Sequence, residues 1–497
     1  MVAVRLPGKL RTYADGHERV DVEAATVAQA LRAAVAEFPD LNLRLFDERG
    51  DVSSELVVFH RDTQVSKSEL ATTIVEHDDH VDIIFSVAGA AEDVRMRGFR
   101  ERVTVEDARA AALDGVVPLA SEAVPVTECA GRVLATSVTS RVSVPPFRRA
   151  TMDGYAVRAG DTFGASPYSP IVLAVTGASM PGDSVIESIG VGEAARIMTG
   201  APVPDGADAV LRAEDAGERL DDVEVRAAVA EGRNIGRIGE DIDAGTEVLA
   251  SGRRLLAQDV GLLASIGHNP VLVHRRPSVR IIVSGDELLA PGEAPGDSHI
   301  VDSNSPMLAT LVSRDGGIPD VARLPDDQEM MRAALAEPGA DVIVTAGAAS
   351  VGTEDIVPLL VAELGELMVH GVAMRPSSPS GVGRIGGVPV LLVPGNPVSC
   401  LVAYDFFAGP VIRRLGGRAE QWPYSTVRLA LRKRLVSQIG RTDYARVVVR
   451  EDRVEPLAVS GASVLSSVTR ASGFVVIPEG LEGYAAGAEV DVHLYAP

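Results

Sequence analysis

The chain of 497 residues has little cysteine, little lysine and no long hydrophobic run. Its two cysteines, Cys129 and Cys400, are far apart in sequence, which excludes a disulfide framework and a cysteine-based zinc site and fits a reducing cytoplasm. No apolar run approaches the roughly 20 residues needed to cross a bilayer. The first residues are too short and too alternating for a signal peptide. We therefore expect a cytoplasmic protein that has no membrane partner.

Positive charge is also scarce. The chain has 47 Lys and Arg against 69 Asp and Glu, which gives a formal net charge of -22. Such a surface repels nucleic acid and anionic membranes, so neither is expected as a partner. A phosphate or oxyanion ligand must then be bound by local amides, helix N-termini and a few arginines.

The length suggests three or more domains at about 150 residues each. Near the N-terminus, a strand that alternates Val2 with Val4 precedes a helix that begins with a Thr26–Gln29 capping pattern and ends before Pro39. Apolar runs then predict two further strands. This order predicts a β-grasp domain over residues 1–90, and the charged segment that follows predicts a linker over residues 91–102.

The remaining pattern predicts a multidomain α/β plus β fold. A helix at 105–113 leads into a β-rich subdomain, marked by Gly, Pro and Asp turns between about 140 and 275. Strands then alternate with helices, which predicts a doubly wound α/β domain whose ligands bind outside the carboxyl ends of the strands. Short strands follow to the end of the chain. The expected domains are 103–277 (β-rich), 278–416 (α/β) and 418–497 (small C-terminal β domain). In the α/β domain the expected strands are 279–283, 341–345 and 388–393, and the expected helices are 306–314, 355–364 and 397–415.

Three loops of the α/β domain should meet at one crevice. Ser284–Leu288 carries carboxylates at a strand end, where they can hold a magnesium ion or a proton. Ala346–Gly352 consists of small residues whose amides can face a phosphate. Pro394–Ser399 is fixed by two prolines, and Ser399 can offer its hydroxyl to an anion.

Other acidic residues allow two interpretations. Asp153 lies on a loop constrained by the preceding prolines, which is either a plain strand-entry turn or a site loop. Asp302 and Asp326 precede helices and are each read more simply as helix caps. The histidines show no paired metal-ligand spacing, and the sequence has neither a serine hydrolase elbow nor a Walker lysine.

Four motifs in this order resemble the molybdopterin molybdenumtransferase family, of the MoeA type that also forms the C-terminal domain of gephyrin. The motifs are Pro145–Val157, Met198–Pro202, Ser284–Leu288 and Pro394–Ser399, and the resemblance extends from Val103 to Ala496. It implies insertion of molybdate into adenylylated molybdopterin, with Mg²⁺-dependent release of AMP, in molybdenum cofactor biosynthesis. It also implies a homodimer whose site lies between the α/β domain of one subunit and the β-rich domain of the other.

The resemblance also implies roles for individual residues. The implied catalytic residues are Asp153, Asp241, Asp286, Glu287 and Asp326. Of these, Asp286 and Glu287 would hold Mg²⁺, and Asp241 would reach the site from the partner subunit. The implied substrate-binding residues are Thr199, Glu214, Gly347, Ser350, Gly352, Asp355, Arg375, Ser378, Pro394, Pro397 and Ser399.

Two loops depart from the family pattern. The family has Ser-Gly-Gly-Val-Ser-Val-Gly where this chain begins with Ala346, and Lys-Pro-Gly-Lys-Pro where this chain has Arg375-Pro-Ser-Ser378-Pro. A lost cation beside a polyanionic substrate should cost about 1–3 kcal/mol per charge-assisted contact. Two alternatives to an ordinary insertase therefore stay open: a non-catalytic molybdopterin-binding or scaffold paralogue, and an insertase tuned to tungstate.

The N-terminal segment resembles the sulfur-carrier proteins of molybdopterin and thiamine synthesis. Those carriers end in a free Gly-Gly, whereas Gly89 is followed here by Ala90 and the rest of the chain. The domain is then either a retained interaction domain for other cofactor-pathway proteins, which we favour, or a carrier that needs cleavage after Gly89 or Ala90.

Overall fold

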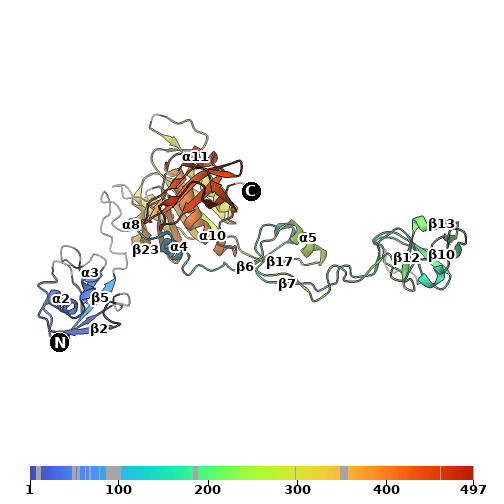
Figure 1. Ribbon diagram of the computed structural model, residues 1–497, viewed down its shortest axis with the longest axis horizontal. Helices are drawn as coiled ribbons and strands as arrows, with labels where there is room; N and C mark the ends of the chain where they lie inside the picture. The colour runs from blue at the N-terminus through green and yellow to red at the C-terminus, as the bar shows by residue number, and fades with distance from the viewer. Residues whose placement is uncertain are drawn as a thin grey trace.

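The computed structural model describes most of the chain. Its domains follow one another along an elongated molecule (Figure 1). The N-terminal domain lies at one end, the β-rich sheet at the other, and the α/β domain with the C-terminal domain between them. None of the described helices is both long and apolar enough to span a membrane. The described residues are 1–6, 10, 13–46, 52, 56–61, 63–65, 69–77, 79–85, 102–182, 188–296, 298–347, 356–458 and 461–495.

The N-terminal domain has the predicted β-grasp topology. Its five strands are ordered β2-β1-β5-β3-β4, with β1 and β5 parallel at the centre and α2 packed over the buried face. Thr26 Oγ1 accepts from Gln29 N at 3.3 Å, as the capping pattern predicted. Gly89, Ala90 and all of the linker except Arg102 lie outside the described residues. The elements are β1 (Val2–Arg5), β2 (Arg19–Val22), α2 (Val27–Glu37), α3 (Asn42–Leu45), β3 (Leu56–His60), β4 (Thr63–Val65) and β5 (His80–Phe85).

The next region is β-rich, as predicted, except at its two ends. The predicted helix α4 (Val105–Leu113) packs against the α/β domain through Ala108 and Ala112. The sequence did not predict α5 (Ala257–Ser265) within this β-rich region, where Asp259 accepts from Leu256 N at 2.9 Å and so starts the helix. The strands are β6 (Ser121–Val124), β7 (Val138–Thr139), β8 (Arg149–Ala150), β9 (Gly154–Val157), β10 (Ile171–Ser179), β11 (Glu193–Ile197), β12 (Ala209–Arg212), β13 (Ala216–Glu218), β14 (Asp222–Val225), β15 (Ile235–Gly236), β16 (Glu247–Leu249) and β17 (Val271–His274).

The α/β domain has a six-stranded sheet in the order β21-β18-β22-β26-β25-β23. The first four strands are parallel, whereas β25 and β23 form an antiparallel edge that the sequence did not predict. Two expected helices begin elsewhere, α6 at Asn304 and α8 at Val357. The elements are β18 (Ser278–Ser284), β19 (Leu288–Leu289), β20 (Ile300–Val301), α6 (Asn304–Arg314), β21 (Ile318–Leu324), α7 (Gln328–Ala336), β22 (Val342–Ala346), α8 (Val357–Leu364), β23 (Glu366–His370), β24 (Met374–Arg375), β25 (Gly381–Ile385), β26 (Val388–Val393), α9 (Pro397–Ala403) and α10 (Gly409–Leu415), with a π-helical turn at Tyr404–Ala408.

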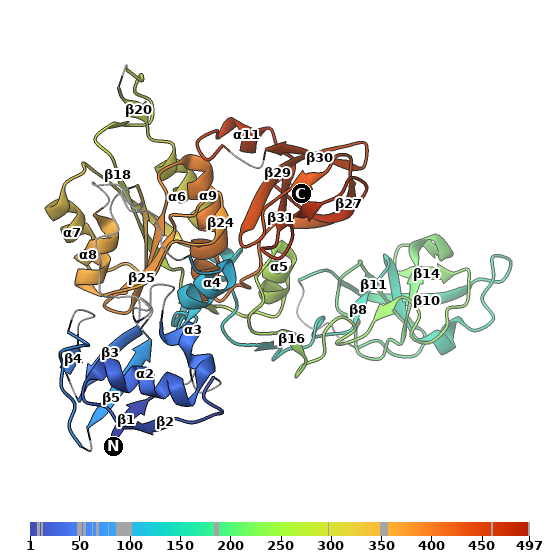
Figure 2. The ribbon, with the colours of Figure 1, turned by 60° about the vertical axis from the view of Figure 1, so that its left-hand side comes forward.

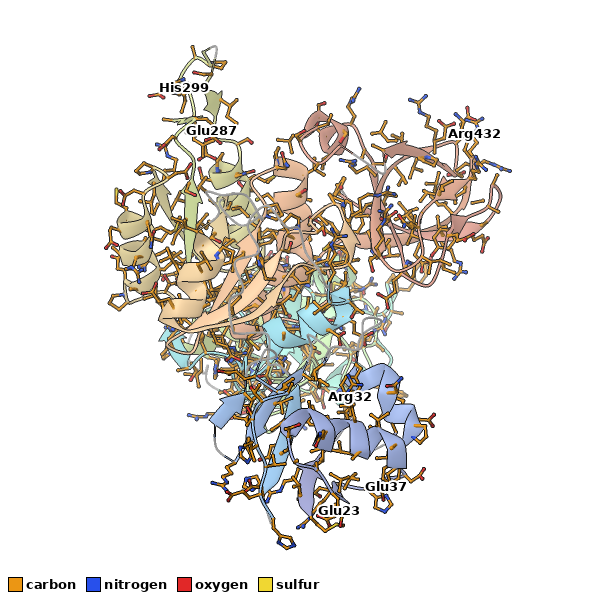
Figure 3. The ribbon with its side chains drawn as sticks, turned by 90° about the vertical axis from the view of Figure 1, so that its left-hand side faces the viewer. Glu23, Arg32, Glu37, Glu287, His299 and Arg432 are labelled. Carbon is orange, nitrogen blue, oxygen red and sulfur yellow. The ribbon has the colours of Figure 1, made fainter. Side chains whose placement is uncertain are left out.

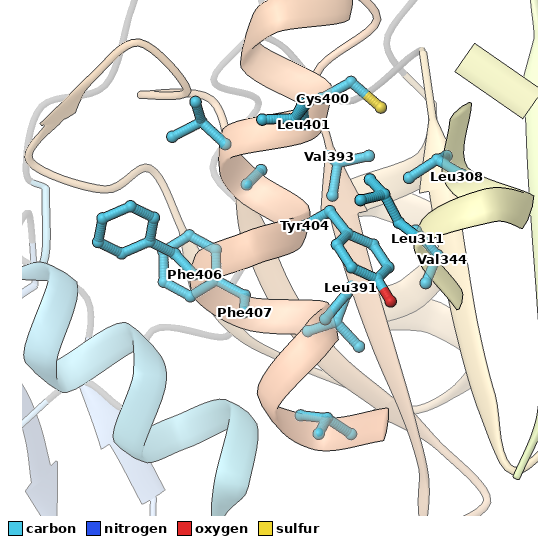
Figure 4. Packing of buried hydrophobic residues seen from close by; sticks show 14 of the residues in the cluster. Leu308, Leu311, Val344, Leu391, Val393, Cys400, Leu401, Tyr404, Phe406 and Phe407 are labelled. Carbon is cyan, nitrogen blue, oxygen red and sulfur yellow. The ribbon is translucent and has the colours of Figure 1, made fainter. Parts of the chain in front are cut away.

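Helices cover both faces of this sheet, which explains its continuous apolar strands. On one face, Val344 and Leu391 pack with Tyr404 and with side chains of α6 and α9 (Figure 4). On the other face, Ile343 and Leu392 pack against α7 and α8. The sheet is thereby a rigid base for the loops at its carboxyl edge.

The C-terminal domain is a small β-barrel joined to the α/β domain through a shared strand pair. Its sheet runs β29-β30-β27-β33-β31, and a further β29–β31 pairing closes it. β24 of the α/β domain pairs with β29, which sets Arg375 beside Asp443. The elements are β27 (Ser425–Leu431), β28 (Leu435–Val436), β29 (Thr442–Arg450), β30 (Arg453–Ala458), α11 (Ser466–Thr469), β31 (Gly473–Ile477), β32 (Gly483–Tyr484) and β33 (Glu489–Leu494).

Candidate active site

A cavity of about 600 Å³ lies at the carboxyl ends of β18, β22 and β26. This is where an open α/β sheet binds its ligands, and the three predicted loops do meet here. Figures 2 and 3 show the neighbouring β20 arm and the N-terminal domain at opposite ends of the α/β domain. The predicted residues that line the cavity are Glu287, Asp326, Gly347, Pro394 and Pro397.

The acidic residues come from two neighbouring loops. Asp286 Oδ1 accepts from Asp326 N at 3.1 Å, and Asp326 Oδ2 accepts from Asp286 N at 3.4 Å. Glu287 lies at the base of the arm that carries His299 (Figure 3). Each of the two aspartates uses one carboxylate oxygen to brace the other loop. Glu287 and Asp326 line the cavity, so their carboxylates can face a ligand there, whereas Asp286 is not among the lining residues.

The glycine of the second loop is required by its close packing. Gly347 has φ +100°, and a Cβ atom there would lie 2.6 Å from the carbonyl oxygen of Ser284. The two loops therefore meet backbone to backbone at the cavity. Ser350, Gly352 and Asp355 lie outside the described residues, so their predicted binding roles remain predictions.

Two polar groups in the cavity wall were missed by sequence reasoning. Asn304 is 8% exposed and donates from Nδ2 to Gly395 O at 2.6 Å. Its Oδ1 atom, like the hydroxyl of Ser284, has no hydrogen-bond partner among the described residues. Asp302 Oδ1 accepts from Asn304 N, so the cap interpretation was right for Asp302. Because Asp302 already caps the start of α6, the Asn304 side chain is not needed as a cap.

A smaller cavity of about 270 Å³ adjoins the first and shares Pro379, Pro394 and Asn396 with it. The predicted residues Arg375, Ser378 and Ser399 line it. The Ser378 hydroxyl and Arg375 Nε are buried without a hydrogen-bond partner among the described residues. The smaller cavity thus gathers neutral and cationic donors, the chemistry that an oxyanion needs.

Arg375 is held firmly rather than left free. Its guanidinium lies 2.5 Å from Asp443 Oδ2, and the Asp443 side chain is fully buried. Asp443 also accepts from Ser437 Oγ at 2.8 Å and lies 3.1 Å from Arg441 Nε. Two cations therefore share one carboxylate at the wall of the smaller cavity.

The predicted residues of the β-rich region form a second group. Asp153 Oδ1 accepts from both the backbone N–H and the hydroxyl of Thr199, each at 2.7 Å. These hydrogen bonds lower the pKa of Asp153, which keeps the carboxylate ionised at neutral pH. Asp153 O accepts from Ala213 N at 3.0 Å, which places the neighbouring Glu214 at the same turn. Asp241 follows on the connecting segment, where its N–H donates to Val144 O.

The two groups do not meet within one chain. Figures 1 and 2 both show the β9–β14 sheet at the far end of the molecule from the α/β sheet. The structure therefore brings the predicted site together as two halves. In the part of the chain that the structure describes, no three His, Cys, Asp or Glu side chains lie close enough to hold a metal.

Sequence profiles of three domains match the chain in order. They are the MoeA N-terminal region (domains I and II) at residues 103–267, a probable molybdopterin-binding domain at 280–414 and the MoeA C-terminal region (domain IV) at 428–495. The molybdopterin molybdenumtransferase 2 of Mycobacterium tuberculosis is 36% identical over 385 residues, which cover 74% of this chain and 94% of that protein. The chain belongs to the MoeA family.

Further comparisons agree with this assignment. A putative molybdopterin biosynthesis protein of Methanocaldococcus jannaschii is 36% identical over 384 residues, covering 75% of this chain and 91% of that protein. The crystal structure of a MoeA protein from Pyrococcus horikoshii superposes with a TM-score of 0.70 at 34% identity, covering 80% of this chain and all of that one. The fold expected for residues after about 102 is thereby confirmed, and the N-terminal β-grasp domain precedes the region that the three profiles match.

Proposed function

We propose that this MoeA-family chain is a cytoplasmic molybdopterin molybdenumtransferase. It inserts molybdate into adenylylated molybdopterin, with release of AMP, in molybdenum cofactor biosynthesis. The observation that carries the proposal is the pair of adjoining cavities at the carboxyl edge of the sheet. The larger one has the size of a small-molecule site, and the smaller one has the size and donors suited to a tetrahedral oxyanion.

The chemistry of each cavity supports this division. Asn304 Oδ1 is a buried acceptor with no partner among the described residues, which suits the N–H donors of a pterin. Gly347 allows its loop to pack directly on the Ser284 backbone at the cavity wall. In the smaller cavity, Arg375, Ser378 and Ser399 would bind molybdate.

Magnesium is included in the proposal, with Asp286 and Glu287 as its protein ligands. Mg²⁺ takes oxygen ligands and is often held by one or two carboxylates, waters and substrate phosphates rather than by an all-protein cage. The carboxylates of Asp286 and Glu287 are oxygen donors of this kind, and Glu287 lines the larger cavity. Bound Mg²⁺ would offset the charge that develops on the phosphates as AMP leaves. Asp326 would keep Asp286 in place through the paired loop hydrogen bonds.

We also propose that the working unit is a homodimer. The group of Asp153, Thr199 and Glu214 lies far from the cavities of its own chain (Figure 2). A second copy can bring this ionised group, and Asp241, to the α/β domain. Each dimer would then have two composite sites.

The deciding experiment measures AMP release from adenylylated molybdopterin by the full chain, with and without molybdate, tungstate and Mg²⁺. We expect release that requires both molybdate and Mg²⁺ and that falls at least 100-fold in Asp286→Asn, since the carboxylate then no longer holds the ion. Arg428→Met is the matched control, because among the described residues Arg428 pairs only with the exposed Glu489 in the C-terminal domain.

A second function is favoured by one observation. Arg375 is already paired with the buried Asp443, and Ser378 stands where the family loop carries a second cation. If the chain binds adenylylated molybdopterin tightly but does not turn it over, the chain is a binding paralogue and not an insertase. Faster turnover with tungstate would make tungstate the substrate.

For the N-terminal domain we propose a retained interaction domain that contacts other proteins of the cofactor pathway. The support is its complete β-grasp core within a chain that continues past Gly89. Intact-mass measurement of protein from the native host should give one uncleaved mass. A fragment that ends at Gly89 or Ala90 would instead establish a sulfur-carrier precursor.

A further inference from the structure

A third cavity, of about 130 Å³, lies where the β-rich region joins the α/β domain at the β17–β18 connection. It shares no lining residue with the two cavities of the candidate site. Four arginines line it, Arg132, Arg275, Arg276 and Arg418, together with His274. So many cations around one small space are unexpected in a chain of net charge -22.

Two of the four arginines are neutralised by carboxylates. Arg132 pairs with Glu122 and also donates to His274 O at 2.8 Å. Arg275 makes a bidentate pair with Asp341, with N···O distances of 2.7 and 2.8 Å. These two pairs explain their positions without any ligand.

The other two arginines have no carboxylate partner among the described residues and donate to backbone carbonyls instead. Arg276 donates to Gly316 O at 3.2 Å and to Gly317 O at 2.7 Å. Arg418 donates to Arg314 O at 2.8 Å and to Gly131 O at 2.9 Å. The carbonyls of Arg314, Gly316 and Gly317 lie at the end of α6 and in the turn after it, and the carbonyl of Gly131 lies between β6 and β7. The bonds therefore orient the two side chains. Each guanidinium has five N–H donors, and the bonds leave both positive charges uncompensated.

A third cation stands beside them. Arg254 forms an isolated β-bridge at Val133, next to the cavity wall, and has no ion-pair partner among the described residues. Burial, followed by the charges of Arg254 and Arg276, lowers the pKa of Arg418 to about 10. Asp315 opposes this effect, but it already forms an ion pair with Arg413 at 3.0 Å and accepts from the Tyr404 hydroxyl at 3.0 Å.

The close approach of Arg418 to the wall depends on a glycine. Gly316 has φ +95°, and a Cβ atom there would lie 2.6 Å from Arg418 Cζ. Glycine is therefore needed at this position for two reasons. The turn after α6 has a positive φ, and the Arg418 guanidinium packs directly on Gly316. Arg276 and Arg418 are thus held in place by the turn after α6.

We propose that this arginine pocket binds a small tetrahedral oxyanion of the phosphate or sulfate class. Guanidinium groups suit such ions because their planar N–H donors match two oxygens at once. The volume admits one such ion with water but excludes a nucleotide. The pocket wall comes from both sides of the β17–β18 connection, so the bound ion ties the β-rich region to the α/β domain. The site is independent of the proposed insertase activity.

The test is titration of the full chain with inorganic phosphate, and separately with sulfate, at constant ionic strength set by chloride. Calorimetry should give saturable binding, and the unfolding temperature should rise with either ion. Arg254→Met should weaken binding about tenfold, and it should keep the fold because the side chain has no ion pair to lose among the described residues. Arg276→Met with Arg418→Met should abolish binding. Arg428→Met is the matched control and should change nothing.

Two outcomes would overturn the proposal. One is a response to phosphate and sulfate no larger than that to chloride. The other is unchanged affinity in Arg254→Met together with unchanged affinity in Arg276→Lys, a variant that keeps the charge but loses the paired donors and the fork geometry. Both variants remain informative if the double variant fails to fold.

Discussion

At the scale of single residues, the loop that lines the smaller cavity contains a serine in a conformation that favours glycine. Ser377 has φ +81°, and its hydroxyl donates to Ser399 O at 2.7 Å. The left-handed conformation costs a non-glycine residue about 1–2 kcal/mol, and the hydrogen bond returns about 0.5–1.5 kcal/mol. The side chain thus offsets the strain that it causes.

This balance predicts an order of stability. Ser377→Ala keeps the strain and loses the hydrogen bond, so it should lower the free energy of unfolding by about 1 kcal/mol. Ser377→Gly loses both and should stay closer to the wild type. Urea unfolding of the three proteins would measure the order. A glycine variant less stable than the alanine variant would show that relief of the backbone strain does not outweigh the greater flexibility of glycine in the unfolded chain.

Asp443 predicts a larger effect, because it is the buried partner of Arg375 and Arg441. Asp443→Asn leaves two cations without their carboxylate and should cost about 3–5 kcal/mol of unfolding free energy. Arg375→Met should cost clearly less, since Asp443 keeps Arg441 and Ser437. Denaturant titration of both variants would compare them, with Asp491→Asn on the exposed face of β33 as the control. Equal losses would contradict the shared-carboxylate arrangement.

The candidate site shows what residue patterns can and cannot reveal. Glu287 was predictable because strand ends place loop carboxylates at one edge of a parallel sheet. Asp326 came only from the family resemblance, because the strand before it, β21, was not predicted. Asn304 was missed because its role depends on Gly395, 91 residues later in the chain, whose carbonyl orients it. The pairing of Arg375 with Asp443 was missed because it depends on two domains sharing a strand pair.

At the scale of elements, prediction succeeded where burial is complete. The strands β18, β22 and β26 are covered on both faces, so their sequences are mostly apolar, with the buried Arg280 as an exception in β18. The edge strand β21 contains Pro319 and Asp320 and is half-exposed, so its pattern gave no clear signal. Helix α5 was missed because no Ser, Thr, Asp or Asn occupies its first position, and Asp259 reaches back to cap it instead.

The start of α5 predicts a pH dependence. Asp259 is buried, and hydrogen bonds from Arg253, at 3.0 and 2.9 Å, lower its pKa. A lowered carboxyl pKa stabilises the fold above the unfolded value of about 4, and this contribution is lost as the pH falls through the folded value. Asp259→Asn should therefore cost about 1–3 kcal/mol at pH 7 and much less near pH 3.

Thermal unfolding of the wild type and Asp259→Asn across pH 3–7 would check this dependence. The matched control is Glu363→Gln, whose partner Arg332 forms an exposed pair on α7 and α8. Such exposed pairs contribute less than about 1 kcal/mol. A gap between Asp259→Asn and the wild type that stays constant with pH would mean that packing, and not charge, holds α5.

At the scale of the whole molecule, the domain order could be read from the periodicity of the sequence, but the domain positions could not. Each hydrophobic pattern shows which face of one element is buried. The distance between Asp153 and the cavities depends instead on how the β6–β17 strand pair connects the β-rich region to the α/β domain. The homodimer expected from the family resemblance is consistent with this separation. A homodimer with composite sites makes a prediction that a site formed within one chain does not make.

The prediction concerns mixtures of two inactive variants. Asp153→Asn lacks the β-rich half of the site, and Asp286→Asn lacks the α/β half, so each homodimer should be inactive. If they are mixed and allowed to exchange subunits, half of the dimers combine one copy of each. In such a dimer one composite site is intact and the other is doubly damaged. The mixture should therefore regain about a quarter of the wild-type rate of AMP release.

The control separates complementation from simple mixing. Asp153→Asn mixed with Thr199→Val damages the β-rich half in both copies, because Thr199 is the hydrogen-bond donor to Asp153. That mixture should stay inactive, although its subunits exchange equally well, as copies carrying two different tags would show. If exchange occurs but the first mixture also stays inactive, the two groups belong to separate functions. The cavities of the α/β domain would then have to complete their site with residues of their own chain.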